Sequence, residues 1–314
     1  MRFLPKIKVS SHSFSKNKKL QELLLKQFPN TIFNETGQIL QGSNLFHFIQ
    51  DADGIIAGQE NLNSSILNKT SKLKVISKYG VGLDNINFEY CKKQNIQVKW
   101  TAGVNKRSVA ELTLSFMLTL CKNFYPTSIQ LKNGVWNKTG GIDLSQKTIG
   151  IIGVGNIGKE LIELLKPFRC KILVNDILDQ SNYYKKHQLF STLKEKILKE
   201  SDIVTIHTPL TQQTTNLINL NSIQLMKKSA FLINTARGPI VNQNALKKAL
   251  LNQWIAGAAL DVYSTEPPTD KKFLNIPNLI CSPHIGGNSQ ESVFAMGTAA
   301  IQNLKNFFIN YKPK

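Results

Sequence analysis

Three polar side chains follow apolar runs in the second half of the chain, and their types suit acid–base chemistry on a carboxylic acid. Arg237 follows FLINTA, Glu266 follows ALDVY, and His284 ends LICSPH. A guanidinium group binds a carboxylate through two parallel hydrogen bonds. An imidazole exchanges protons with oxygen near neutral pH, and a carboxylate on its second ring nitrogen would orient it. We interpret the three residues as a carboxylate clamp, an orienting acid and a proton donor.

The use of arginine at position 237 is itself informative. The chain has 39 Lys and Arg residues, of which only four are Arg. Because Lys supplies the positive charge almost everywhere else, Arg237 indicates a task that needs the forked guanidinium group. For each of the three residues taken alone, a surface ion pair or a packed side chain is the simpler alternative. The sequence does not show that they meet in space.

A glycine-rich segment indicates a dinucleotide site. Gly153-Val154-Gly155-Asn156-Ile157-Gly158 has the G-x-G-x-x-G spacing, after a β-rich apolar run and before the amphipathic stretch NIGKELIELLKPF. Such glycines allow a tight turn and close approach of the backbone to a pyrophosphate at a helix N-terminus. Asp176 ends the next predicted strand, where a carboxylate accepts hydrogen bonds from the ribose hydroxyls of NAD. The alternative is a strand, turn and helix that merely pack closely.

The same glycines also match most of a P-loop, which would bind a nucleoside triphosphate. Glu160 stands where a P-loop has Ser or Thr to hold Mg²⁺, and its charge would repel phosphates. The sequence therefore excludes an NTPase and favours NAD as the cofactor.

Alternating strand and helix patterns must position these residues. The predicted strands are 6–10, 54–58, 73–77, 96–100, 148–155, 171–176, 202–209, 230–236, 256–263 and 279–284, and the predicted helices include 18–28, 109–124, 244–254 and 291–308. This alternation predicts an α/β fold of parallel sheets with helices on both faces. Ligands bind beyond the carboxyl ends of such strands, so the three polar residues and the glycine segment could face one cofactor.

The composition narrows the class of protein. The chain of 314 residues carries a formal net charge of +19, but the excess is spread along it without a basic tail or an Arg-rich stripe, which argues against specific nucleic-acid binding. No apolar run is long enough to span a membrane, and MRFLPKIKVS lacks the features of a signal peptide. Four scattered cysteines without C-x-x-C spacing predict no metal site and a cytoplasmic location.

Several ordered motifs together resemble the D-isomer-specific 2-hydroxyacid dehydrogenases, and within that family the chain is most similar to phosphoglycerate dehydrogenases. The resemblance covers about residues 50 to 308. The motifs that carry it are KYGVGLDNIN, SVAELTLSFML, QLKNGVW, TIGIIGVGNIGKEL, HTPLTQQTTNLIN, INTARGPIVN, AGAALDVYSTEPP and SPHIGG.

The resemblance implies a role for each site residue. The catalytic residues would be Arg237, Glu266 and His284, and the backbone around Val81 and Gly82 would bind the substrate carboxylate. The residues that contact NAD would be Gly153, Gly155, Asn156, Ile157, Gly158, Asp176, His207, Thr208, Pro209, Thr235, Ala236 and Asp261.

The resemblance also implies the domain organisation. A flavodoxin-like substrate-binding domain would comprise residues 1–102, completed by a C-terminal helix at 288–314, and a Rossmann NAD-binding domain at 103–287 would be inserted into it. The cleft would close by a hinge, and a long helix near 105–123 would form much of a homodimer interface. Because the sequence ends at Lys314, without the regulatory domains of longer relatives, we expect no feedback by serine through such a domain.

The implied reaction is reversible hydride transfer between NAD(H) and a D-2-hydroxy acid or its 2-oxo acid, with D-3-phosphoglycerate and 3-phosphohydroxypyruvate as the favoured pair. Lys78 would then meet the substrate phosphate, where some relatives carry Arg. Gly58-Gln59 replaces an Arg-Ser pair of other relatives, so glyoxylate, hydroxypyruvate or another small 2-oxo acid is the alternative. An alternative of another class is a non-enzymatic NAD(H)-sensing protein, because corepressors share this fold.

Overall fold

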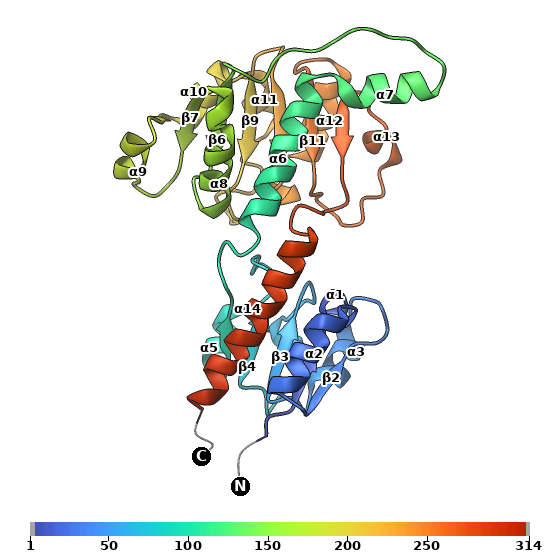
Figure 1. The fold of residues 1–314 in the computed structure, drawn as a ribbon, viewed down its shortest axis with the longest axis vertical. Helices are drawn as coiled ribbons and strands as arrows, with labels where there is room; N and C mark the ends of the chain where they lie inside the picture. The colour runs from blue at the N-terminus through green and yellow to red at the C-terminus, as the bar shows by residue number, and fades with distance from the viewer. Residues whose placement is uncertain (1–3, 312–314) are drawn as a thin grey trace. The chain divides into compact units, whose positions relative to one another are not determined.

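A computed structural model describes residues 4–311 and divides them into two compact units. Unit 1 comprises the chain up to Asn105 and from Asn288 onward, and unit 2 comprises Lys106–Gly287 (Figure 1). Unit 2 is thus inserted into unit 1 along the sequence. The predicted segments 1–102 and 288–314 both extend past the described residues, at positions 1–3 and 312–314.

Unit 1 is built on a five-stranded parallel sheet. The strands are β1 (Ile7–Val9), β2 (Thr31–Phe33), β3 (Gly54–Ala57), β4 (Val75–Lys78) and β5 (Gln97–Lys99). Their order is β2-β1-β3-β4-β5, with all neighbours parallel. This is the strand order of flavodoxin-like folds, in which ligands bind where the order reverses.

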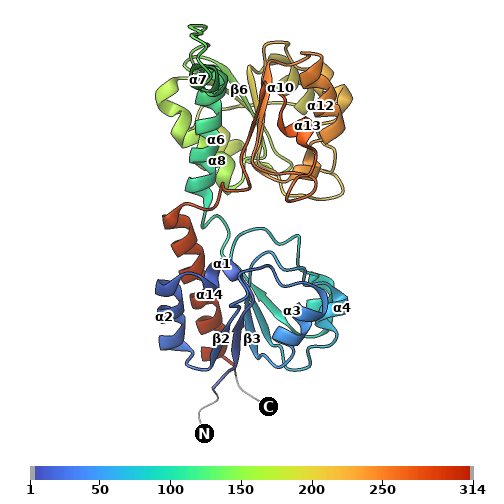
Figure 2. The same ribbon diagram turned by 90° about the vertical axis from the view of Figure 1, so that its right-hand side faces the viewer.

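Helices cover both faces of this sheet (Figure 2). They are α1 (His12–Ser15), α2 (Lys18–Gln27), α3 (Gly42–Ile49), α4 (Ser64–Leu67), α5 (Phe88–Lys93) and α14 (Gln290–Ile309). Successive residues of a strand point to opposite faces. Accordingly, Ile55 packs in one apolar cluster with Leu45 of α3, whereas Ile56 packs in another with Leu20 of α2 and Leu304 of α14.

Unit 2 contains a seven-stranded parallel sheet. The strands are β6 (Thr148–Ile152), β7 (Lys171–Asn175), β8 (Phe190–Ser191), β9 (Ile203–Ile206), β10 (Phe231–Asn234), β11 (Gly257–Leu260) and β12 (Leu279–Cys281). Their order is β12-β11-β10-β9-β6-β7-β8. Counted from β6, this is the Rossmann order 3-2-1-4-5-6 with one further strand, and the order reverses between β6 and β9.

Two helical layers enclose the sheet of unit 2. The helices are α6 (Lys106–Cys121), α7 (Phe124–Lys132), α8 (Asn156–Leu165), η1 (Lys166–Phe168), α9 (Ser181–Lys186), α10 (Lys194–Glu200), α11 (Leu220–Gln224), η2 (Gly238–Ile240), α12 (Gln243–Leu251) and α13 (Lys271–Leu274). One core joins α6 and α8 to the sheet, and the other joins α10, α11 and α12 to its opposite face. The predicted fold class, two doubly wound α/β units with one inserted in the other, is confirmed.

Several element boundaries differ from the prediction. The strand expected at 148–155 ends at Ile152, because Gly153 adopts a φ of +96° that breaks the extended backbone. The helix expected at 109–124 begins at Lys106 and ends at Cys121, and a second helix, α7, begins after Asn123, whose φ is +51°. β2 and β8, which the sequence did not predict, have three and two residues.

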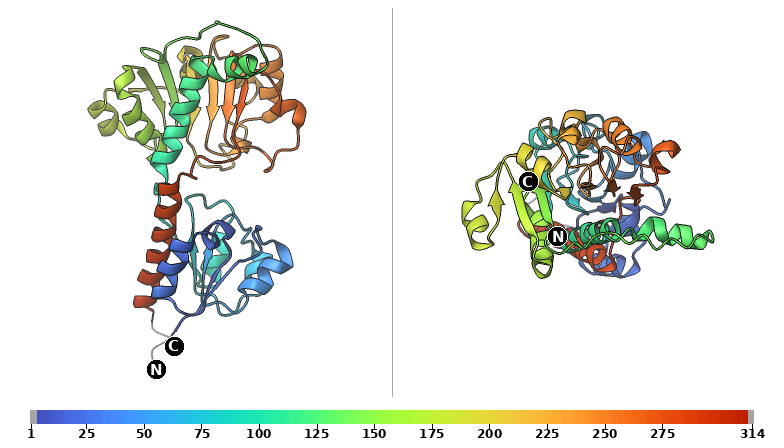
Figure 3. Two further views of the ribbon diagram at one scale, coloured as in Figure 1. Left: turned by 45° about the vertical axis from the view of Figure 1, so that its right-hand side comes forward. Right: turned by 90° about the horizontal axis from the view of Figure 1, so that it is seen from above.

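Helix α7 and the segment that follows it extend away from the sheet of unit 2 (Figure 3). None of its residues is buried. Phe124 is 64% exposed and Trp136 is 76% exposed. Among the described residues, no helix is both long and apolar enough to cross a membrane.

Candidate active site

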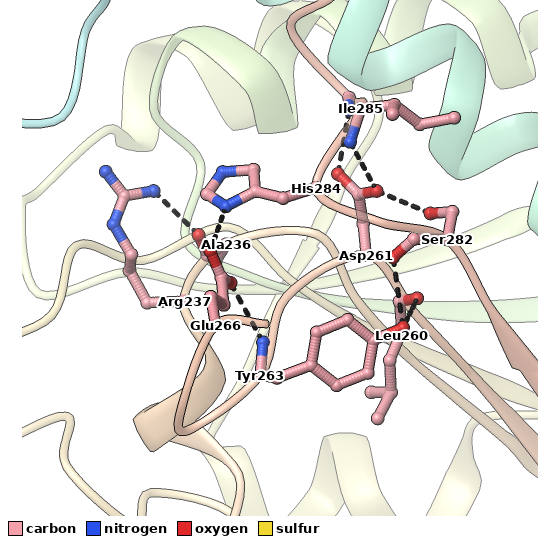
Figure 4. Close-up of polar contacts among 10 residues, drawn as sticks. Ala236, Arg237, Leu260, Asp261, Tyr263, Glu266, Ser282, His284 and Ile285 are labelled. Carbon is pink, nitrogen blue, oxygen red and sulfur yellow. Dashed lines mark hydrogen bonds and ion pairs between the residues drawn. The ribbon is translucent and has the colours of Figure 1, made fainter. Parts of the chain in front are cut away.

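The carboxyl ends of three neighbouring strands bring the predicted acid–base residues together. Arg237 follows β10, Glu266 lies in the loop after β11, and His284 follows β12. These strands are adjacent and parallel in the sheet, so their carboxyl ends share one edge. Figure 4 shows the three side chains gathered there. The topology of unit 2 therefore brings together three residues whose proximity the separate sequence motifs could not establish.

His284 and Glu266 form a hydrogen-bonded pair. The Nδ1 atom of His284 lies 2.7 Å from Oε2 of Glu266, and the side chains are 36% and 35% exposed. The other carboxylate oxygen, Oε1, accepts a hydrogen bond of 3.0 Å from the backbone N–H of Tyr263. With both oxygens held, the carboxylate fixes the imidazole ring through Nδ1, and Nε2 is the ring nitrogen left for the predicted proton exchange.

This pair shifts both pKa values in the direction that general acid catalysis needs. The hydrogen bond to Glu266 raises the pKa of His284, although burial and the charge of Arg237 oppose the rise. Burial raises the pKa of Glu266, but its hydrogen bonds to His284 and Tyr263 outweigh that effect and lower it below its ordinary value. At neutral pH Glu266 is therefore ionised and favours the protonated form of His284.

A close backbone approach places Arg237 beside this pair. A Cβ atom at Gly238 would overlap the carbonyl carbon and oxygen of Tyr263, so only glycine allows the two segments to touch. The side chain of Asn234 adds a second restraint, because its Nδ2 donates to the carbonyl of Arg237 at 2.9 Å and its Oδ1 accepts from Ala236 N at 3.0 Å. The guanidinium Nη1 donates to Ala236 O at 2.8 Å.

Asp261, at the end of β11, holds the turn that carries His284. Its carboxylate accepts hydrogen bonds from the backbone N–H of Ile285 at 2.8 Å and of Gly286 at 2.7 Å, and also from the hydroxyl of Ser282. His284 has a φ of +54°, a left-handed conformation that few residues other than glycine adopt. Asp261, which is 1% exposed, thus holds the backbone directly after His284 and also bonds the side chain of Ser282, two residues before it.

The glycine segment has the geometry of a phosphate cradle at the start of α8. A Cβ atom at Gly158 would overlap Gly153 O, and one at Gly153 would lie 2.7 Å from the carbonyl of His207. Gly155, the N-cap of α8, has no other residue within 4 Å of its Cβ position. The backbone N–H groups at this helix start are thus accessible to an anion, which fits a pyrophosphate.

The remaining predicted cofactor residues lie along the same edge of the sheet. Asp176 follows β7, and its Oδ2 accepts from Val154 N at 2.6 Å, which ties it to the glycine turn. His207 and Thr208 follow β9 and are succeeded by the exposed Pro209. His207 is buried, and burial lowers its pKa to about 3, so it is neutral at physiological pH.

Two buried polar atoms at this edge have no hydrogen-bonding partner within residues 4–311: His207 Nδ1 and Thr208 Oγ1. Buried polar groups are rarely left unpaired, so these atoms fit the lining of a ligand site. On the next strand, Thr235 Oγ1 lies 3.0 Å from Thr113 Oγ1 of α6, and Ala236 is buried. Together with the open helix start, these observations fit a bound dinucleotide.

Four residues that sequence reasoning missed contribute to this edge: Asn234, Tyr263, Ser282 and Ile177. The first three hold Arg237, Glu266 and Asp261 through the hydrogen bonds described above. Ile177 follows Asp176 and is 99% exposed, which is unusual for a large apolar side chain next to a predicted ribose ligand. Its position directly after Asp176 was the only available signal.

The residues predicted to contact the substrate from unit 1 lie at the end of β4 and in the loop after it. Lys78 is the last residue of β4 and is 6% exposed. Val81 and Gly82 are half-buried in the loop that follows. Within the described part of the chain, no group of three or more His, Cys, Asp or Glu side chains is placed to hold a metal ion.

Comparison with known proteins identifies the family. Residues 114–286 match the model of the NAD-binding domain of the D-isomer specific 2-hydroxyacid dehydrogenases. The chain belongs to this family. It has the NAD-binding domain of the D-2-hydroxyacid dehydrogenases, and the predicted membership and cofactor are confirmed.

Relatives within the D-2-hydroxyacid dehydrogenases carry different names. A D-3-phosphoglycerate dehydrogenase from Methanocaldococcus jannaschii is 34% identical over 87% of this chain. A glyoxylate reductase from Thermofilum pendens is 37% identical over 83% of this chain and 79% of its own length. This chain spans about half the length of the phosphoglycerate dehydrogenases that it matches, 54% and 49% for two of them.

A solved structure of a D-lactate dehydrogenase from Aquifex aeolicus, in complex with NAD and lactic acid, is 27% identical, with a TM-score of 0.86. The match covers 96% of this chain and 94% of that one. The similarity therefore extends over both units and not only over the NAD-binding domain.

Replacing Glu266 with Gln tests the pair electrostatically. Glu266→Gln keeps the shape but removes the charge that raises the pKa of His284. Because His284 is the predicted proton donor, we expect kcat/KM for reduction of a 2-oxo acid to fall as pH rises through that pKa. In Glu266→Gln the falling limb should move to lower pH by roughly one unit. The measurement is kcat/KM for the 2-oxo acid across pH 5 to 10, followed by NADH oxidation. A falling limb at the same pH in both proteins would contradict the effect of Glu266 on the pKa of His284.

Replacing Gly238 with Ala tests the backbone approach beside Arg237. The added Cβ would overlap the carbonyl of Tyr263, which cannot rotate away, so the loop that carries Glu266 must shift. We expect kcat/KM to fall by about 100-fold, because small displacements of catalytic groups are costly. Gly140→Ala is the matched control, since nothing lies within 4 Å of its Cβ position. Equal activity of the two variants would show that the close contact between Gly238 and Tyr263 is not needed for catalysis.

Proposed function

We propose that this chain catalyses the reversible interconversion of a D-2-hydroxy acid and its 2-oxo acid with NAD(H). One observation carries the proposal: the 2.7 Å pair of His284 and Glu266 lies beside Arg237 at the same sheet edge as the glycine turn. This arrangement offers a proton donor, its orienting carboxylate and a carboxylate-binding guanidinium next to a dinucleotide site. Enzymatic reduction of a 2-oxo acid can use all three groups.

The residues that would hold NAD are the N–H groups at the start of α8, Asp176, and the segments 207–209 and 235–236. Bound NAD(H) supplies or accepts the hydride. Within the site, protonated His284 donates a proton from Nε2 to the carbonyl oxygen of the 2-oxo acid during reduction. In the opposite direction neutral His284 accepts the hydroxyl proton at the same atom.

Glu266 and Arg237 support this proton transfer in different ways. Glu266 stabilises the positive charge of His284 and fixes the ring through Nδ1. Arg237 binds the substrate carboxylate and polarises the adjacent carbonyl group, which favours charge development on its oxygen. Asp261, which the family resemblance assigns to the nicotinamide carboxamide, holds the His284 turn through Ile285 and Gly286. In unit 1, the backbone around Val81 and Gly82 is proposed to bind the substrate carboxylate.

Two classes of substrate fit this chemistry. The sequence motifs favour D-3-phosphoglycerate and 3-phosphohydroxypyruvate, which would place the protein in serine biosynthesis. Glyoxylate or hydroxypyruvate is the second candidate, supported by a named glyoxylate reductase that matches over 79% of its own length. Both classes share the 2-oxo acid that the proposed clamp and proton donor recognise.

We also propose that the protein acts as a homodimer in the cytoplasm. The arm formed by α7 and the segment after it exposes Phe124, Leu131 and Trp136, each more than half exposed. Exposed apolar side chains of this size suit a protein–protein contact, and a second copy of the chain is the partner that the family resemblance implies for the adjacent helix α6. The four free cysteines suit a reducing compartment.

Turnover of 2-oxo acids tests the reaction directly. Purified protein should oxidise NADH, followed at 340 nm, with at least one of phosphohydroxypyruvate, hydroxypyruvate, glyoxylate and pyruvate. His284→Ala should lower kcat by about 1,000-fold or more, because the proton donor is lost, while the Kd for NADH stays within about threefold. Tight NADH binding without turnover of any acid would instead support the NAD(H)-sensing alternative.

The oligomeric state tests the proposal that α7 and the segment after it form a dimer contact. Light scattering after size exclusion should give twice the mass of one chain for the native protein. The double variant Phe124→Ser/Trp136→Ser should shift to one chain mass at micromolar concentration, because it removes two large exposed apolar side chains. Leu251→Ser, at the end of α12 and 62% exposed, is the control and should remain a dimer.

A further inference from the structure

The ammonium group of Lys78 is engaged inside unit 1. Its side chain is buried, and Nζ donates to the carbonyl of Gly58, directly after β3, and to Oδ1 of Asn85 at 2.7 Å. Gly58 lies in the turn that follows the neighbouring strand, and Asn85 lies just past the loop that begins after Lys78. A single cation thus joins three segments at the carboxyl edge of the sheet.

Asn85 completes the connection. Its Nδ2 donates to Gly58 O at 3.0 Å and to Glu60 O at 2.6 Å, and its carbonyl accepts from Leu62 N at 2.8 Å. Lys78 and Asn85 are the residues on either side of the loop 79–84. Their mutual hydrogen bond therefore joins the two ends of that loop. The other hydrogen bonds of Asn85 attach the loop to segment 58–62.

Glu60 holds the second polar group of the Gly58 backbone. It is 0% exposed, and its Oε2 accepts a hydrogen bond of 2.6 Å from Gly58 N. The two polar groups of residue 58 are thus held by side chains of opposite charge, N–H by Glu60 and C=O by Lys78. Burial raises the pKa of Glu60, and the charge of Lys78 opposes that rise. The buried ammonium group of Lys78 is stabilised by its hydrogen bonds to Gly58 O and Asn85 Oδ1.

The turn itself leaves little room for a further cationic side chain. A Cβ atom at Gly58 would lie 2.9 Å from Ser11 Oγ and 3.7 Å from Oε2 of Glu60. Any side chain at residue 58 would have to displace Ser11, which is 3% exposed. The edge of unit 1 next to loop 79–84 therefore combines a buried carboxylate with a cation that protein acceptors already bind.

We propose that Lys78 is a positioning residue which, with Asn85 and Glu60, fixes loop 79–84 for an unphosphorylated 2-oxo acid. The inference rests on the proposed function and deepens it, since it selects the second of the two substrate classes. To bind a phosphate dianion, Lys78 would have to give up Gly58 O and Asn85 Oδ1.

Hydroxypyruvate and phosphohydroxypyruvate, which differ only by the phosphate, provide the test. We expect the native protein to use hydroxypyruvate with a kcat/KM at least about tenfold above that for phosphohydroxypyruvate. Lys78→Met should lower kcat/KM for both acids by a similar factor, about tenfold or more, mainly through KM. The reason is that the hydrogen bonds that hold the two ends of loop 79–84 together are lost. Lys78→Arg, which keeps the cation, should recover part of this loss.

The ratio of the two kcat/KM values separates positioning from phosphate binding. If Lys78 binds a phosphate, the native protein prefers phosphohydroxypyruvate, and Lys78→Met lowers only that activity; this result would overturn the inference and leave the proposed reaction intact. Lys72→Met is the control, since Lys72 is an exposed lysine just before β4, and both activities should be unchanged. Absence of turnover of every 2-oxo acid by the native protein contradicts the proposed function instead.

Hydrogen exchange tests the loop without turnover. In Lys78→Met and in Asn85→Ser, backbone amides of residues 79–86 should exchange at least about tenfold faster than in Lys72→Met, because the closing hydrogen bonds are lost. Asn85→Ser serves as the second variant if Lys78→Met does not fold. Unchanged exchange in this loop would refute the positioning role.

Discussion

The hydrogen bond between His284 and Glu266 is the interaction on which the arrangement of unit 2 depends. An imidazole that delivers a proton must be charged, oriented and held at one place, and a single carboxylate on Nδ1 meets the first two needs. The third is met by the backbone around it. Asp261 holds the turn that contains His284, and Tyr263 holds the second oxygen of Glu266. Strands β10, β11 and β12 are the frame that lets loops far apart in sequence supply these groups.

The two units use buried carboxylates in a similar way. In unit 2, Asp261 accepts hydrogen bonds from backbone N–H groups of the loop that carries His284, the proposed proton donor. In unit 1, Glu60 accepts Gly58 N–H in a network that also includes Lys78 and Asn85. In both places an ionisable side chain stabilises the loop beyond a parallel strand, where the sheet itself no longer supplies hydrogen bonds. Loop shape at the ligand edge is thus set by side chains that need not touch a ligand.

The sequence predicted the fold class because its signals are local. Apolar runs of four or five residues, glycine spacing and helical periodicity define β6, α8 and most other elements without reference to tertiary contacts. β2 and β8 were missed because two or three residues do not establish a period. The types of Arg237 and His284 suggested their chemistry, but the approach of Gly238 to Tyr263 and the burial of Lys78 depend on long-range packing. No pattern within a single segment records such contacts.

The return of the chain to unit 1 affects how the protein is made. Met296, Ala300 and Leu304 of α14 belong to the same apolar core as Ile7 and Leu20 near the start of the chain. A ribosome therefore completes all of unit 2, which is continuous from Lys106 to Gly287, before it releases the helix that closes unit 1. During synthesis one face of the sheet of unit 1 is therefore covered by α1 and α2 but not yet by α14, while the inserted unit can already fold. The part of unit 1 that precedes unit 2 in the chain thus reaches its full native packing only after unit 2 has been synthesised.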